Sequence, residues 1–182
     1  MHSKPESVKD LLELLMSGRG FNFYDNKNQA RADDLLVRQR SSGFLTEASQ
    51  ALTALEPAFR EAYIPPSTRE NPFPPAEAMA KLKAIGQLRS KISDLETQIR
   101  SMAVPTQDKV WWRFRDERVL LEQLVGFDFQ MVSQCRDIAD EVRAVSADDW
   151  NARNVSAEIG LKLSQLQSSI RERQQFLAIQ VI

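Results

Sequence analysis

The sequence predicts an all-α protein, an antiparallel bundle of three to four long helices with a short N-terminal helix. Three observations support this class. Glycine is scarce, with six in 182 residues, and five of the eight prolines lie together in residues 64–75. The rest of the chain is rich in helix-forming Leu, Ala, Gln, Glu and Arg. Apolar residues recur every three or four positions over long stretches, as they do in bundles and coiled coils.

The proline cluster divides the chain, because proline is costly inside a helix and consecutive prolines prefer an extended path. Residues 64–75, IPPSTRENPFPP, are therefore expected to be a connector. Residues 1–63 should hold helices and an aromatic loop, and we expect them to belong to the same bundle. Residues 76–182 should form a helical hairpin followed by a C-terminal helix.

The first 26 residues predict a short helix and a loop. The helix is expected at about 8–16, with Ser7 as its cap, and SGRG at 17–20 should end it. The loop that follows, FNFYDN, is the most aromatic in the chain. Its Phe21, Phe23 and Tyr24 either plug one end of the bundle or form an interaction surface.

The segment from about 27 to 63 should also be helical. Its second half carries a regular apolar stripe: Leu45, Ala48, Leu52, Leu55, Phe59 and Ala62. Leu35, Leu36 and Val37 are out of phase with that stripe, and SSG lies at 41–43 between the two halves. We therefore expect a break, a kink or a shift of register at 41–43. Pro57 should bend the helix without ending it, because the stripe continues through it.

Two long helices are expected next, at 76–103 and about 107–145. The first has an apolar stripe with a regular 3-4-3-4-3 spacing: Ile85, Leu88, Ile92, Leu95, Ile99 and Met102. The second continues the same spacing from Val110 to Val145. VPTQD at 104–108 stops one helix and restarts the next. Because this connection is short, we expect a coiled-coil-like antiparallel hairpin over 76–145.

QDKVWWRFRDERVLL, residues 107–121, mixes aromatic and basic residues. On a helix, Phe114 lies on the core stripe and Trp112 points away from it. The basic charges are partly balanced by nearby acidic residues, which disfavours nucleic acid or an anionic membrane as the partner. We interpret the stretch as core and flank, with Trp112 as a candidate anchor for a protein partner.

Charged residues interrupt two of the apolar stripes. Glu117 and Asp128 occupy inward positions of the 107–145 helix, and Arg173 does so in the last helix. A buried unpaired charge is costly, so each needs a partner, and Arg173 or Arg89 could supply it for the carboxylates. These residues either set the register of the bundle or line a ligand pocket in its core.

The last helix should begin at Ser146, where Asp149 has capping-box spacing, or again near Asn154. Its stripe consists of Ile159, Leu163, Leu166, Ile170 and Leu177. The chain ends in FLAIQVI, and an apolar end of this kind is expected to dock against the protein or a partner.

Composition disfavours several kinds of chemistry. The 24 Lys and Arg nearly balance the 25 Asp and Glu, so an overall basic surface for nucleic acid is absent. The single histidine, His2, and the single cysteine, Cys135, exclude a Ser-His-Asp triad, a Cys-His dyad, a Cys/His zinc site and an intramolecular disulfide. We expect no cofactor and no metal, and Cys135 as a small core residue rather than a redox sensor.

These observations favour a non-catalytic helical interaction module: an adaptor, scaffold, chaperone or assembly subunit that works by helix packing. The partner would be another protein or a second copy of the chain, and we expect a homo-oligomer in the cytoplasm with neither a transmembrane segment nor peripheral membrane contact. The alternative is a ligand- or metal-binding bundle, a sensor or a carboxylate-based enzyme that uses polar residues inside the core.

Overall fold

A computed structural model of the chain describes residues 29–70, 72–102 and 118–179. This part of the chain contains helices and no strands, which confirms the all-α class. The described helices are α2 (Gln29–Tyr63), α3 (Ala76–Arg100), α5 (Arg118–Ala144), α6 (Ala147–Ala152) and α7 (Val155–Ile179). The expected helix at 8–16, the aromatic loop at 21–26 and the connection at 104–108 lie outside the described residues.

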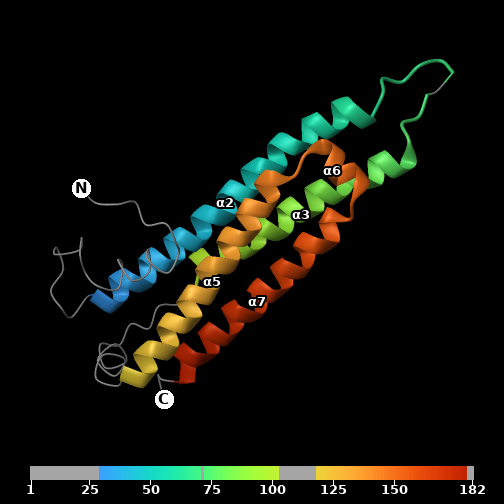
Figure 1. Ribbon diagram of the computed structural model, residues 1–182. Helices are drawn as coiled ribbons and strands as arrows, with labels where there is room; N and C mark the ends of the chain where they lie inside the picture. Colours follow the sequence, from blue (N-terminus) through green and yellow to red (C-terminus); the bar gives the residue numbers. More distant parts are fainter. Residues whose placement is uncertain (1–28, 71, 103–117, 180–182) are drawn as a thin grey trace.

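The four long helices form an elongated bundle in which successive helices run in opposite directions (Figure 1). Helix α2 packs antiparallel to α3, as the pairing of Glu56 with Arg89 near one end and of Arg38 with Met102 at the other shows. Helix α5 packs antiparallel to α7. The neighbouring pairs α2/α5 and α3/α7 run in parallel.

The expected hairpin over 76–145 differs in one respect from the structure. Helices α3 and α5 run antiparallel, but each packs against α2 and α7, which places α3 and α5 diagonally across the bundle. A short connection determines which end of the bundle the next helix starts from. It does not determine which helices become neighbours, because that depends on which apolar faces are in contact.

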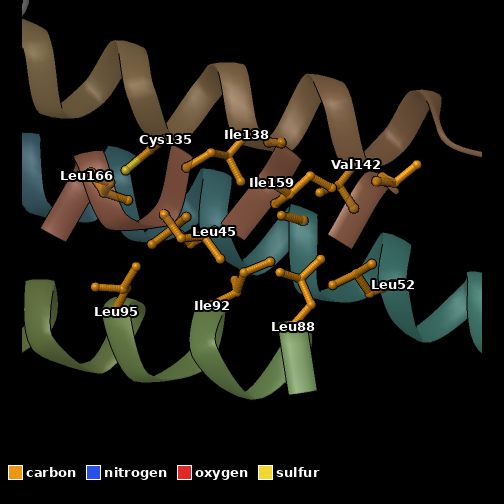
Figure 2. Packing of buried hydrophobic residues seen from close by; sticks show 14 of the residues in the cluster. Leu45, Leu52, Leu88, Ile92, Leu95, Cys135, Ile138, Val142, Ile159 and Leu166 are labelled. Carbon is orange, nitrogen blue, oxygen red and sulfur yellow. The ribbon is translucent and has the colours of Figure 1, made fainter. Parts of the chain in front are cut away.

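The core is a continuous layer of apolar side chains from all four long helices. Figure 2 shows its middle: Leu45 and Leu52 from α2, Leu88, Ile92 and Leu95 from α3, Cys135, Ile138 and Val142 from α5, and Ile159 and Leu166 from α7. All six residues of the stripe expected in α3 are buried, and so are the five expected in α7. The stripes that predicted these two helices are confirmed.

Of the break, kink or shift of register expected at 41–43, the break is wrong, because helix α2 is continuous from Gln29 to Tyr63 and passes through Pro57. The buried positions of its first half are Asp34, Val37, Arg38, Ser41 and Ser42. Asp34, Arg38 and Ser41 continue the three- and four-residue spacing of the apolar stripe that begins at Leu45. The stripe is therefore unbroken, but it is polar in its first half, with the buried apolar Val37 beside it, and a search for apolar residues alone could not follow it.

The turn from α5 to α7 contains both of the helix starts that the sequence suggested. The Ser146 hydroxyl accepts a hydrogen bond from the Asp149 N–H at 3.1 Å, and the Asp149 carboxylate accepts one from the Ser146 N–H, which completes a capping box. The short helix α6 then ends, and α7 begins at Val155. The buried Trp150 fixes α6 to the bundle, because its indole N–H donates to the carbonyl of Lys81 in α3.

Replacing Ser146 with alanine should lower the free energy of unfolding by about 1 kcal/mol, because the Ser146 hydroxyl accepts from the Asp149 N–H and donates to the Asp149 carboxylate, and both hydrogen bonds are lost. Urea denaturation measures the change. Ser164→Ala is the matched control, since its hydroxyl bonds only to a carbonyl within its own exposed helix turn. An equal loss in both variants would show that the capping box contributes nothing specific.

Candidate functional site: a buried ionic cluster and an open groove

Four charged side chains meet inside one end of the bundle, and we call them the ionic cluster: Asp34 and Arg38 from α2, Asp128 from α5 and Arg173 from α7. All four are buried, and Arg173 is only 1% exposed. Charged side chains are rarely buried to this degree unless they are paired. The cluster therefore requires an account of where each charge finds its partner.

Arg173 lies at the centre of the cluster and binds two carboxylates. Its Nε donates to Asp128 Oδ1 at 2.5 Å, and its Nη2 donates to Asp34 Oδ1 at 2.6 Å. The second carboxylate belongs to α2, the helix diagonally opposite α7. Asp34 also pairs through Oδ2 with Arg38 Nη2 at 2.9 Å. Two arginines and two aspartates thus balance one another inside the core.

Arg38 extends the cluster to the fourth helix. Its Nη1 donates to the carbonyl of Met102, just beyond the last turn of α3, at 2.9 Å. Carbonyls at the end of a helix lack partners within the helix, so an arginine is a favourable partner there. Groups from α2, α3, α5 and α7 are thereby joined in one network at this end of the bundle.

Burial dominates the electrostatics of the carboxylate in α5. Removal from water raises the pKa of Asp128 to about 6, against the opposing effect of the Arg173 guanidinium, and the nearby Asp34 carboxylate adds to the rise. Burial by itself would lower the pKa of Arg173, but the carboxylates of Asp128 and Asp34 outweigh it and raise that pKa. Arg173 is therefore charged at any physiological pH, and Asp128 titrates near the lower end of that range.

The sequence-predicted polar residues can now be located. Asp128 and Arg173 lie together in the cluster. Glu117 lies outside the described residues, as do Trp112 and the aromatic residues Phe21, Phe23 and Tyr24. Arg89, suggested as a partner for the inward carboxylates, instead pairs with Glu56 at 3.3 Å on the partly exposed outer side of α2 and α3.

Sequence reasoning missed the two members of the cluster in α2. Asp34 and Arg38 are four residues apart, and with Ser41 and Leu45 they continue a 4-3-4 spacing into the apolar stripe. That spacing was the available signal. It could be found only by extending the stripe backwards from Leu45 without requiring apolar residues.

Cys135 is buried in the core between Met131 and Ile138, and burial raises the pKa of its thiol to about 12. A thiol is reactive mainly as the thiolate. At neutral pH this side chain is therefore a small core residue.

The outside of α2 carries a second feature, which we call the α2 groove. It is a hollow of about 730 Å³ beside the first half of the helix, lined by Leu35, Leu36, Phe44, Arg38, Arg40 and Arg100 among others. Leu35 is 60% exposed, while Leu36 and Phe44 are half-buried against the core. Only Arg100 in this set comes from α3.

Comparison with known proteins gave no match: neither a family model, nor a curated protein, nor a solved structure resembles this chain. Among the described helices, none has the length and apolar character needed to cross a membrane. Within the same residues, no three His, Cys, Asp or Glu side chains come together as a candidate metal site.

Proposed function

We propose that this chain is a non-catalytic helical interaction module, an adaptor, scaffold, chaperone or assembly subunit that binds a partner by helix packing. The observation that carries the proposal is the α2 groove, where an exposed leucine and two half-buried apolar side chains lie along one helix. Grooves of this kind suit the apolar face of a helix. The partner is another protein or a second copy of the chain.

The ionic cluster supports this function over the alternative of a ligand-binding bundle. A ligand or substrate in the core would need polar groups left free to contact it. Arg173 instead uses its guanidinium on Asp128 and Asp34, and Asp34 uses its second oxygen on Arg38. Each of the four charges in the cluster thus has an opposite charge beside it, and among the atoms of these four side chains Asp34 Oδ2 and Arg38 Nε are buried without a hydrogen bond. The exposed apolar side chains available for recognition lie outside the cluster.

The long apolar stripes no longer argue for association, because one chain buries them. Leu88, Ile92 and Leu124 belong to the core. The argument for a partner depends on exposed apolar side chains such as Leu35.

The proposal is tested by introducing a charge into the groove. Leu35→Glu is compared with Leu161→Glu, because Leu161 in α7 is similarly exposed, at 63%, but lies away from the groove. Light scattering on a sizing column and chemical cross-linking in the native cell should detect a complex that Leu35→Glu removes and Leu161→Glu retains. A chain that is monomeric when purified and forms no cross-linked complex in the cell would contradict the proposal.

A further inference from the structure

The α2 groove has the length of a short helix. Its lining extends from Leu35 to Glu47, which at 1.5 Å per residue corresponds to about 18 Å, or roughly three helical turns. Gly43 lies in this lining, and a Cβ added to it would meet no atom within 4 Å. The absence of a side chain at this point lets another backbone approach α2 closely.

The charges around the groove are unequal. Among the described lining residues there are three arginines and one carboxylate, Glu47, which is already bound by Arg143 of α5 at 2.9 Å. Arg100 pairs with Glu96, and Arg38 with Asp34. For Arg40, no described carboxylate lies within ion-pair distance. Arg38 is buried, so the described rim presents two exposed arginines beside an apolar floor: Arg40, without a described carboxylate, and Arg100, beside Glu96.

We propose that the α2 groove binds an acidic amphipathic helix of a partner protein, whose apolar face covers Leu35, Leu36 and Phe44 and whose carboxylates face Arg40 and Arg100. This inference rests on the proposed function and names the chemistry of the partner. The apolar floor supplies affinity, and the arginine rim selects acidic over basic helices.

The test uses the full-length protein and two synthetic amphipathic peptides of about 15 residues, long enough to fill the groove. Both carry the same leucine stripe, flanked by glutamates in one and by lysines in the other. Fluorescence anisotropy should show saturable binding of the acidic peptide and at least a tenfold weaker affinity for the basic one. In the double variant Arg40→Glu/Arg100→Glu this preference should reverse.

Leucine variants distinguish binding in the α2 groove from non-specific hydrophobic binding of the peptide. Leu35→Ser should weaken binding of the acidic peptide by at least tenfold, whereas Leu161→Ser on α7 should leave it unchanged. Neither leucine is buried, so both variants should keep the unfolding temperature of the wild type. Equal effects of the two variants, no saturable binding, or a peptide preference that survives the Arg40→Glu/Arg100→Glu change would overturn the proposal.

The α2 groove could instead be occupied by residues 8–16 of the same chain or by a second copy of the chain. Either result would overturn the assignment of the groove to a partner protein. A gain of tenfold or more in peptide affinity on Asp10→Lys/Glu13→Lys in the full chain would assign the groove to residues 8–16. A dimer that Leu35→Ser dissociates would assign it to a second copy. If the peptides fail but a cross-linked complex persists in the cell, the interaction function stands and only the acidic helix is excluded.

Discussion

Replacing Arg173 with methionine should lower the free energy of unfolding by about 3–5 kcal/mol, because it leaves carboxylates buried without their cation. Asp128 would lose its only described ion-pair partner, and Asp34 would keep Arg38 alone. Methionine fills a similar volume with a flexible apolar chain, so the loss reports the charge rather than a large cavity. Guanidinium denaturation followed by circular dichroism measures the change.

Arg143→Met provides the matched control. Arg143 also contacts two carboxylates, Glu47 and Asp140, but its side chain is 49% exposed. Water can replace those contacts, so the expected loss is at most about 1 kcal/mol. Similar losses in the two variants would mean that burial of the ionic cluster has no energetic consequence.

Stability should depend on pH through Asp128. Burial raises its pKa from the usual 3.8 to about 6, so the folded chain holds this proton more tightly than the unfolded chain does. Its contribution therefore favours folding fully below about pH 4 and is lost as the pH rises through 6. At about 1.4 kcal/mol per unit, the contribution amounts to about 3 kcal/mol.

Asp128→Asn isolates this effect, because asparagine does not titrate. The difference in unfolding free energy between wild type and Asp128→Asn should shift by about 3 kcal/mol between pH 4 and pH 7, with the wild type relatively more stable at the acidic end. Asp140→Asn, at an exposed ion pair, should show no shift of this size and direction. A difference that stays constant with pH would show that Asp128 keeps an ordinary pKa.

The parts of the fold that the sequence predicted are those where apolar spacing matches the helical repeat. Helices α3 and α7 have unbroken stripes, and their buried faces follow directly from them. The capping box at Ser146 and Asp149 could also be predicted from the sequence, because it depends on two residues three positions apart. These features depend on residues close together in the sequence.

The features that sequence reasoning missed depend on contacts between distant segments. Asp34 looks like a surface residue until Arg173, 139 positions away, is placed beside it. The diagonal placement of α3 and α5 likewise depends on which faces meet, which no single stripe determines.

The α2 groove could not be predicted from the sequence for a related reason. Leu35, Leu36 and Val37 were out of phase with the apolar stripe, and this predicted a break, a kink or a shift of register in the helix. In the continuous helix Val37 is buried in the core, whereas Leu35 and Leu36 lie beside the core stripe and Leu35 is exposed. Two of the residues that suggested a break therefore mark the candidate interaction surface.

A double-mutant cycle tests most directly the central claim that the buried charges of the ionic cluster stabilise one another. Unfolding free energies are measured for wild type, Asp128→Leu, Arg173→Met and the double variant, which keeps the Asp34–Arg38 pair intact. Removing both charges together should cost less than the sum of the single losses by about 2 kcal/mol or more, because neither is then left unpaired. Losses that add to within about 0.5 kcal/mol would contradict the claim, since the two groups would then act independently.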